Sequence, residues 1–298
     1  MLHCLFCNSA HVKPCSFQDA ALFNNKTWRY VKCMECRLVM LDPLPSMEEL
    51  DIMYDSDYHA AYYFKGETYS VIGYEKILKD PQIKKILDFG CGDGAFLRAL
   101  ESYPFNKDGV EYKEDLVETL KRQLSAVNFF TIDQFLTNSN KTYDLIHLGD
   151  VLEHSNDPKG LLQMLTGKLN ANGYLLIVGP LEANNNLAYF SRRVAQTIKK
   201  IFKKDPRHGY TPYHLIFTNA RNQMELFKRA GYHTIRYNVY ETPWPYPEQL
   251  PDSLLGAIKF LVARISIVLS GIIPGWGNRF RYIGRKSPVP SLLKQGMR

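Results

Sequence analysis

The segment KKILDFGCGDG, from Lys84 to Gly94, constrains the fold of this chain more than any other segment. Its first six residues predict a buried strand, the glycines that follow predict a tight turn, and the apolar pattern from Ala95 to Leu100 predicts a helix. A strand, a glycine loop and a helix in this order open a doubly wound sheet. We therefore expect an α/β protein.

The rest of the chain continues the alternation of strands and helices. We expect the remaining strands at Lys107 to Tyr112, Asn128 to Thr131, Tyr143 to Leu148, Tyr174 to Val178, Tyr232 to Tyr240 and Arg279 to Arg285, and a helix at Asn219 to Ala230 that Gly231 ends. This order predicts a mostly parallel, seven-stranded, Rossmann-like sheet with helices on both faces. We expect an N-terminal segment (1–60) and an α/β domain (61–298) with a basic insertion at 184–210 and a hydrophobic helix at 251–275.

Four cysteines near the N-terminus form two CxxC pairs, Cys4 with Cys7 and Cys33 with Cys36. Two such pairs can complete a tetrahedral shell of four thiolates around zinc, at about 2.3 Å from the ion. Because no position of the ion stays open, the zinc would be structural. The spacing leaves His3 or His11 open as a substitute for one thiol, and a redox CxxC as the alternative to a metal site.

The glycine loop also indicates which ligand the sheet binds. Gly90, Gly92 and Ala95 satisfy the loose dinucleotide pattern, and Glu111 stands at the end of the next strand, where a ribose-binding acid is expected. A pyrophosphate would be repelled by Asp88 and Asp93, however, whereas the ammonium and sulfonium groups of S-adenosylmethionine would be attracted. The charges favour S-adenosylmethionine, with helix capping as the alternative role of Asp88.

The net charge of +7 is divided unevenly along the chain. Residues 184–210 carry +6, the residues after Asp252 carry +8 with no acid among them, and the remainder sums to −7. This division excludes a uniformly basic coat for nucleic acid. We expect solvated faces, a site for the phosphates of a nucleotide- or lipid-linked sugar, or contact with an anionic membrane.

The apolar run from Leu254 to Ile273 is long enough to cross a membrane, but Lys259 and Arg264 lie within it. Its apolar residues recur at steps of three and four, which predicts an amphipathic helix rather than a membrane span. The first ten residues show neither the basic flank nor the apolar stretch of a secretion signal. We expect a cytoplasmic protein with reduced cysteines, and peripheral membrane contact is one possibility that the helix raises.

The motifs LDFGCGDGAFL, VEY and DLIHLGDVLEHSNDP resemble those of class I S-adenosylmethionine-dependent methyltransferases. CLFCNS, KCMECRLVMLDPLPSMEEL and YTPYHLIFTNARNQMELFKRAGY resemble a subgroup with an N-terminal zinc segment, which includes sugar C-methyltransferases and glycan-cluster methyltransferases. The resemblance covers about residues 1 to 240. Sugar C-methyltransferases carry a further large C-terminal domain, whereas this chain ends soon after its last predicted strand, so we expect O-methylation at least as much as C-methylation.

The resemblance implies roles for particular residues. Asp88, Gly90 and Gly92 would line the methionine end of the cofactor, Gly94 would let the helix start close to it, and Glu111 would bind both ribose hydroxyls. It further implies adenine contact by Asp133 and backbone contact by Gly149 and Asp150. Tyr62 and Tyr63 are expected near the cleft.

Methyl transfer needs an aligned acceptor and a group that removes its proton. The candidates are His154, after the fourth predicted strand, and His214, on the loop expected to cover the site; each could instead brace its loop. We expect a small, sugar-like or phosphate-bearing acceptor. The alternatives are an RNA methyltransferase, against which the acidic body and the absence of a recognised RNA-binding motif weigh, and a non-catalytic membrane-peripheral protein. The sequence leaves the oligomeric state open.

Overall fold

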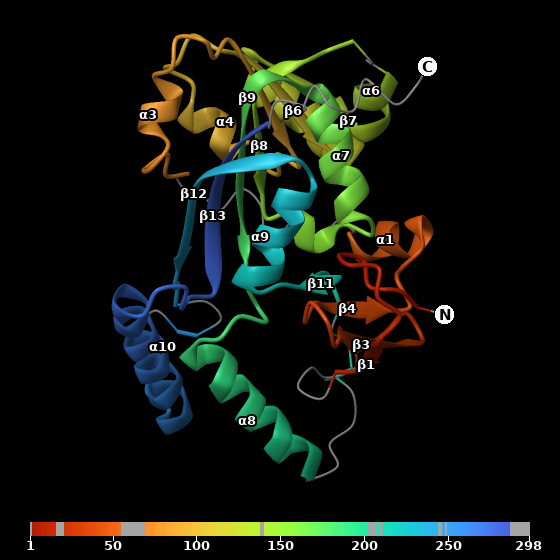
Figure 1. The fold of residues 1–298 in the computed structure, drawn as a ribbon, viewed down its shortest axis with the longest axis vertical. Helices are drawn as coiled ribbons and strands as arrows, with labels where there is room; N and C mark the ends of the chain where they lie inside the picture. The colour runs from red at the N-terminus through yellow and green to blue at the C-terminus, as the bar shows by residue number, and fades with distance from the viewer. Residues whose placement is uncertain are drawn as a thin grey trace, which may run out of the picture.

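A computed structural model of the chain describes residues 2–15, 21–54, 69–137, 140–201, 207–208, 211–243, 246–247 and 249–286. Within these residues a large sheet carries helices on both faces, and a smaller sheet packs at one end of it (Figure 1). The predicted boundary at residue 60, and Tyr62 and Tyr63, lie outside the described residues.

The large sheet has seven strands in the order β12-β13-β9-β8-β5-β6-β7. Its strands are β5 (Lys85–Phe89), β6 (Asn106–Glu111), β7 (Val127–Thr131), β8 (Tyr143–Gly149), β9 (Leu169–Pro180), β12 (Tyr232–Tyr240) and β13 (Arg279–Lys286). The first five strands in chain order pair in parallel, and β13 pairs antiparallel with both β9 and β12. This confirms the predicted doubly wound, mostly parallel sheet.

Helices cover the sheet on both faces because each buried strand presents apolar side chains alternately to either side. One core contains Leu87 and Phe89 of β5 together with residues of α7 and α9, and the other contains Ile86 of the same strand together with residues of α3, α4 and α5. The helices of the α/β domain that connect or follow these strands include α3 (Glu75–Leu78), α4 (Ala95–Ala99), α5 (Glu114–Gln123), α6 (Ile132–Thr137), the 3-10 helix η1 (Leu152–His154), α7 (Pro158–Lys168) and α9 (Ala220–Arg229).

The smaller sheet combines the N-terminal segment with two short strands from later in the chain. It contains β1 (Val12–Pro14), β2 (Ala21–Phe23), β3 (Lys26–Cys33), β4 (Val39–Asp42), β10 (Arg207–His208) and β11 (Ile216–Phe217), and α1 (Met47–Met53) follows β4. Phe6, Val31 and Met40 belong to the same apolar cluster as Leu87 and Phe89 of the large sheet. The N-terminal segment therefore shares a core with the α/β domain.

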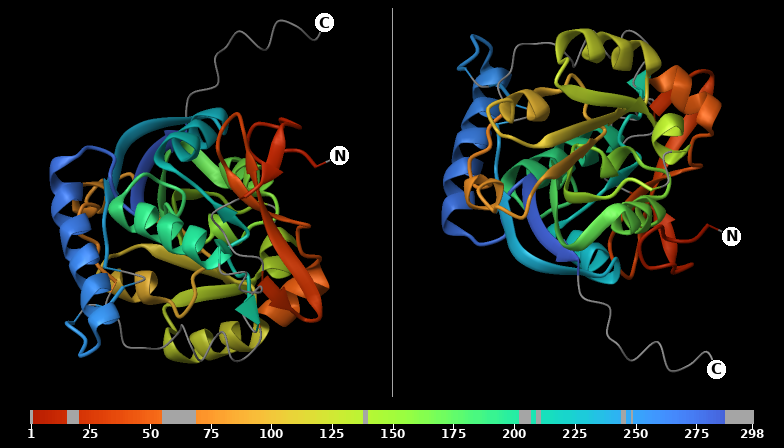
Figure 2. Two further views of the ribbon diagram at one scale, coloured as in Figure 1. Left: turned by 90° about the horizontal axis from the view of Figure 1, so that it is seen from below. Right: turned by 90° about the horizontal axis from the view of Figure 1, so that it is seen from above.

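Two long helices lie apart from this core. α8 (Leu187–Ile201) follows β9, and α10 (Leu254–Ile272) joins β12 to β13. Both emerge at the end of the large sheet where β9 ends, and they contact each other (Figures 1 and 2). The hydrophobic helix was predicted at nearly the same residues.

Candidate active site and metal centre

The loop after β5 turns sharply at three glycines. Gly90, Gly92 and Gly94 have positive φ angles of 72°, 54° and 79°, a region that glycine adopts without the strain a side chain would impose. A Cβ atom at Gly90 would lie 2.5 Å from a methyl group of Val151, so no side chain fits there. Gly94 occupies the N-cap position of α4. The loop thus brings the backbone of β5 and the start of α4 close to the carboxyl edge of the sheet.

Glu111 ends β6 beside this loop, as the sequence predicted. Its Oε2 accepts a hydrogen bond from the Gly92 N–H at 2.8 Å, and its Oε1 accepts one from the Tyr112 N–H at 2.7 Å. Burial raises the pKa of Glu111 despite these donors. A carboxylate has about four lone-pair positions, so each oxygen keeps the capacity to accept a second hydrogen bond. This arrangement suits a pair of ribose hydroxyls.

Asp88 points to the opposite face of β5 from its neighbour Phe89, because side chains alternate along a strand. Its Oδ1 accepts a hydrogen bond from His147 Nδ1 at 2.7 Å, and His147 Nε2 lies 2.8 Å from the Tyr69 hydroxyl. The imidazole ring also stacks on Phe96, with ring centroids 3.8 Å apart. Asp88 is therefore engaged in a buried network, and its contact with a cofactor stays a prediction.

A cavity of about 380 Å³ opens between the glycine loop, Glu111 and the loop after β8. Its lining includes Phe89, Gly90, Glu111, Tyr112, Ile132, Asp150, Val151 and His154, and it also includes Met47, Leu50 and Tyr54 at the N-terminal segment. Four predicted site residues thus meet in one cavity: Gly90, Glu111, Asp150 and His154. The other predicted residues, Asp88, Gly92, Gly94, Asp133, Gly149 and His214, are described but do not line it.

Two of those predictions lie close to the cavity without lining it. Asp133 is exposed in the first turn of α6, next to Ile132, which does line the cavity. Gly149 ends β8, where a Cβ atom would lie 3.1 Å from the His147 ring. Its neighbour Asp150 has a positive φ of 54° and binds Nη2 of Arg279 through both carboxylate oxygens at 2.7 Å. The roles proposed for Asp133 and Gly149 stay predictions.

Nδ1 of His154 has two close oxygen neighbours. It lies 2.9 Å from the carbonyl oxygen of Tyr213, which can only accept. In the tautomer that donates to this carbonyl, Nδ1 carries the hydrogen and Nε2 keeps a lone pair. The hydroxyl of Tyr54 lies 2.5 Å from the same Nδ1. Burial, helped by the charge of His214, lowers the pKa of His154 to about 3, so this histidine is neutral at physiological pH.

His214 lies beside His154 and has the opposite electrostatics. The two imidazole rings are 4.8 Å apart at their centroids and nearly perpendicular. Nδ1 of His214 donates to Oε2 of Glu182 at 2.6 Å. Burial alone would lower the pKa of His214, but the carboxylates of Glu182, Glu153 and Asp150 outweigh it and raise that pKa to about 9. His214 and Glu182 therefore form an ion pair at neutral pH.

Glu153 lies next to His154 and His214 and is the third titratable residue of this group. Its Oε1 is buried, has no hydrogen-bond partner within the described residues and lies 4.0 Å from Nε2 of His154. Burial, followed by repulsion from Asp150, raises the pKa of Glu153 to about 8. Two ligands of one zinc ion at about 2.1 Å lie about 3.4 Å apart, closer than these two atoms. We therefore interpret Glu153 and His154 as groups that move a proton, with the His214–Glu182 pair beside them.

Sequence reasoning did not find Tyr54, Glu153, Glu182, His147 or Arg279. Glu153 and Glu182 each follow a strand of the parallel sheet, and this position at the carboxyl edge was the available signal. His147 interrupts the apolar strand LIHLG, which marked it as a buried polar group needing a partner. Nothing in the sequence connected Arg279 with Asp150. Of the basic insertion, the side chains of Arg192, Lys199, Lys200, Lys203, Lys204 and Arg207 lie outside the description.

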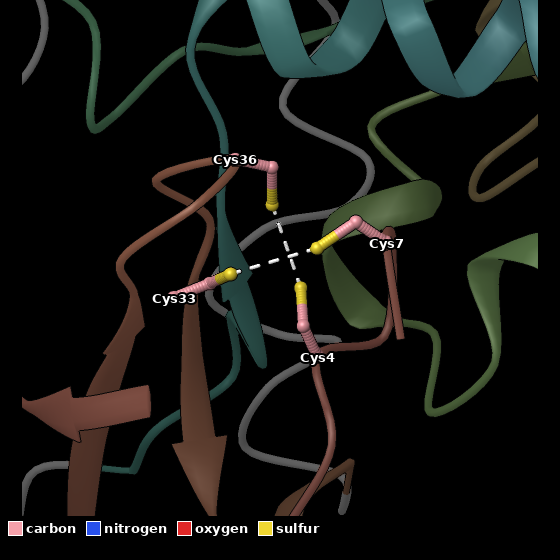
Figure 3. Close-up of side chains that lie close together, drawn as sticks. All are labelled: Cys4, Cys7, Cys33 and Cys36. Atoms are coloured by element: carbon pink, nitrogen blue, oxygen red, sulfur yellow. Dashed lines mark hydrogen bonds between the residues drawn. The ribbon is translucent and has the colours of Figure 1, made fainter. Parts of the chain in front are cut away.

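The four cysteine thiols of the N-terminal segment point toward a common centre (Figure 3). The sulfur atoms of Cys4 and Cys36 are 3.4 Å apart, and those of Cys7 and Cys33 are 3.6 Å apart. Thiolates around a tetrahedral zinc ion are separated by about 3.8 Å, given a zinc–sulfur distance of about 2.3 Å. The geometry of the four thiols fits a closed zinc site.

The two CxxC pairs share one backbone conformation. The N–H of Asn8 donates to the carbonyl of Cys4 at 2.9 Å, and the N–H of Arg37 donates to the carbonyl of Cys33 at 3.0 Å. Asn8 and Arg37 both have positive φ angles, 61° and 65°. Each turn therefore presents its two thiols in the same way. Neither His3 nor His11 belongs to the group of possible ligands.

Comparison with known proteins places the chain within a family. The family described as "Methyltransferase domain" matches residues 64–237, more than half of the chain. The chain is 29% identical over 97 residues to the ubiquinone biosynthesis O-methyltransferase of Coxiella burnetii, covering 31% of this chain and 42% of that protein. It is 25% identical over 168 residues to the mitochondrial arginine-hydroxylase NDUFAF5 of Mus musculus, covering 54% and 46%. The chain thus spans less than half the length of these curated relatives.

Among solved structures, a putative sarcosine dimethylglycine methyltransferase from Galdieria sulphuraria is 16% identical, with a TM-score of 0.45, covering 78% of this chain and 84% of that one. A methyltransferase dependent on S-adenosylmethionine from Archaeoglobus fulgidus is 18% identical, with a TM-score of 0.44 and coverages of 71% and 90%. On the extent of the family match, and with the predicted sheet present, this chain belongs to the methyltransferase-domain family.

Proposed function

We propose that this protein transfers a methyl group from S-adenosylmethionine to a hydroxyl group of a small acceptor. One observation carries the proposal: a single cavity joins Gly90 and Glu111, which suit the donor, to His154, which suits removal of a proton. The family match supports the reaction class. Bound S-adenosylmethionine supplies a methyl carbon that its sulfonium has already activated.

The chain's own residues would hold the donor at the carboxyl edge of the sheet. Glu111 would accept hydrogen bonds from both ribose hydroxyls, since its two oxygens are already oriented by backbone N–H groups. The absence of a side chain at Gly90 lets Val151 pack against the glycine loop, and both residues line the cavity. Ile132 and Val151 would pack on the apolar surface of the adenosine. Tyr54 and Leu50 would close the cavity from the side of the N-terminal segment.

Proton removal would begin at Nε2 of His154, the lone-pair nitrogen of its neutral ring. A pKa of about 3 makes His154 a weak resting base, so the proton needs a better final acceptor. Glu153 meets this need in its ionised form, which becomes populated as pH approaches its pKa of about 8, and its Oε1, unpartnered among the described residues, lies 4.0 Å from that nitrogen. The His214–Glu182 ion pair would then act as a positioning pair that sets the field around Glu153.

The acceptor is proposed to be sugar-like or phosphate-bearing. The resemblance of the N-terminal segment to that of sugar and glycan methyltransferases supports this, as do the seven basic residues between positions 184 and 210. Carbon methylation, as in the sugar C-methyltransferases, is the alternative at the same site. We also propose one structural zinc at Cys4, Cys7, Cys33 and Cys36 and a reducing, cytoplasmic location; the six cysteines form no disulfide.

Calorimetry with S-adenosylmethionine and its demethylated product tests the donor site. We expect micromolar binding, and a loss of about tenfold to a hundredfold in affinity for Glu111→Gln, which removes one charged hydrogen-bond acceptor. Glu118→Gln, an exposed change on α5, is the matched control and should bind like the wild type. Absence of binding by both ligands to the wild-type protein would refute the proposal.

A screen with methyl-labelled donor identifies the acceptor. Sugar nucleotides and lipid-linked sugars should be labelled, and the label should depend on His154. Retention of RNA on filters at physiological salt would instead favour an RNA methyltransferase. NDUFAF5 is named as a hydroxylase although it is similar to this chain. Donor binding without methyl transfer to any acceptor tested would therefore favour another role for the fold.

A further inference from the structure

The apolar stripe of α10 faces outward. Successive residues of an α-helix are turned by about 100°, so the stripe residues fall within about 40° of one line along the helix. All are between 49% and 79% exposed: Leu254, Ile258, Leu261, Ile265, Val268 and Ile272. The buried residues of α10 are instead the small Ala263 and Ser266, on the far side. The helix thus packs on the protein through small side chains and exposes its large apolar ones.

Two basic residues of α10 are exposed. Arg264 borders the stripe at about 80° from its line, whereas Lys259 lies about 140° away, toward the far side of the helix. The guanidinium of Arg264 sits over the Phe260 ring, 4.9 Å from its centroid. No acidic residue occurs in α10 or anywhere after Asp252. An apolar stripe bordered by basic side chains is typical of helices that lie in the plane of an anionic membrane surface.

α8 adds a second outward row beside α10. Phe190, Val194 and Ile198, spaced four residues apart, are between 42% and 60% exposed. The two helices contact each other. The buried side chain of Asn184, just before α8, donates hydrogen bonds to the carbonyls of Gly275 and Gly277, just after α10, at 2.8 and 2.9 Å. Figure 1 shows α8 and α10 at the same end of the molecule. This end therefore carries two exposed apolar rows.

The topology argues against a membrane crossing by α10, although α10 has the length and composition of a membrane-crossing helix. Tyr240 and Arg279, which flank the excursion containing α10, pair directly in adjacent strands. If α10 crossed a hydrocarbon core about 30 Å thick, residues 241–253 would have to cross it too. That segment contains four prolines and the acids Glu241, Glu248 and Asp252, so its sequence is unsuited to the helix that crossing requires.

We propose that α8 and α10 together bind the surface of a bilayer containing anionic phospholipid. The apolar rows enter the acyl-chain boundary, and Lys259 and Arg264 contact the headgroup phosphates. A second copy of this chain fits the surface less well, because its own basic borders would face these same charges. Arg279 pairs with Pro180 at the carboxyl end of β9, so the surface adjoins the edge of the sheet that holds the candidate active site. Binding would turn this edge toward the membrane.

Cosedimentation of the full chain with phospholipid vesicles tests the proposal. Vesicles containing phosphatidylglycerol should bind the protein at least about tenfold more strongly than vesicles of phosphatidylcholine alone, and added salt should weaken this preference. Trp276, which follows α10 and is half-buried, should shift its fluorescence to shorter wavelength on binding. The double variant Ile258→Gln/Ile265→Gln should lower the partition coefficient at least about tenfold.

A matched control uses the same substitutions elsewhere. Ile72→Gln/Ile235→Gln changes two exposed isoleucines outside both helices and should bind vesicles like the wild type. Glutamine is a good helix former, so circular dichroism should be unchanged in the test variant. Wild-type protein that stays in the supernatant with anionic vesicles, or equal binding by both double variants, would overturn the proposal. So would a lipid-free dimer that the α10 variant converts to monomers. None of these measurements needs the methyl donor, so they are independent of the proposed activity.

Discussion

Glu153→Gln should abolish activity and, at alkaline pH, make the protein more stable. In the folded protein the pKa of Glu153 is raised to about 8 by burial, from an ordinary value of 4.5. Between these two pH values the unfolded chain has lost the proton that the folded chain still holds. The free energy of unfolding therefore falls as pH rises through this window and levels off above pH 8. The ionised state would cost the wild-type fold roughly 4 to 5 kcal/mol.

Glutamine has nearly the shape of a protonated glutamate and cannot ionise, so the variant avoids this cost. Urea unfolding of both proteins at several pH values from 5 to 9 measures the difference. The two free energies of unfolding should be close at pH 5. At pH 8.5 the free energy of unfolding of the variant should exceed that of the wild type by several kcal/mol. With an acceptor in hand, kcat should fall by about 100-fold or more, and the acidic limb of the wild-type rate profile near pH 8 should disappear.

Comparing each variant with the wild type cancels the titration of all other groups. Glu225→Gln is a suitable control, because Glu225 is exposed and Arg229 lowers its pKa. That variant should not gain stability as pH rises. If the stability difference between Glu153→Gln and the wild type stays constant from pH 5 to 9, the raised pKa of Glu153 is refuted. Full activity of the variant would refute the role of Glu153 as proton acceptor.

The remaining predictions concern three other features of the site. Glu182→Gln removes the partner of the half-buried His214 imidazolium, whose pKa is about 9. Urea unfolding should show a loss of stability of about 2 kcal/mol at pH 7, allowing for solvent screening, and a smaller loss at pH 9.5, where the wild-type imidazole is mostly neutral. Gly90→Ala should cost about 2 to 4 kcal/mol and eliminate donor binding, whereas Gly167→Ala, in a helix with open space, should be neutral or stabilising by up to about 1 kcal/mol in thermal unfolding. Metal analysis should find about one zinc per chain, which Cys33→Ser loses and Cys15→Ser keeps; unchanged zinc in Cys33→Ser would disprove the assignment.

The framework of the fold could be predicted because its signals are local. Strand β5, its glycine loop and Glu111 are specified by a run of about thirty residues, and the predicted strands match the observed ones to within one or two residues at most ends. β9 is longer than expected because it begins at Leu169, where polar residues of the strand hid the pattern. The two CxxC pairs were also readable, since the spacing of thiols is itself the requirement of the metal.

The grouping of Glu153, Glu182 and His214 around His154 could not be predicted because it depends on contacts between distant segments. Glu153 follows β8, Glu182 follows β9, and His214 precedes β11, so three separate loops meet at one point. Sequence spacing carries no information about which loops touch. The direction of the α10 stripe was equally inaccessible: periodicity reveals that a helix has an apolar face, but the packing of Ala263 and Ser266 decides which way that face points.

The N-terminal segment is part of the candidate active site as well as the place of the proposed zinc site. The Tyr30 hydroxyl of β3 donates to the carbonyl of His214 at 2.8 Å, and β4 pairs with β11 directly after that histidine. Tyr54, at the end of α1, contacts the ring of His154. Both candidate histidines are thus positioned by the segment that carries the two cysteine turns. A zinc ion bound at these turns would therefore act on catalysis by holding β3, β4 and α1 in place, while the glycine loop and Glu111, which belong to the large sheet, would keep their arrangement without it.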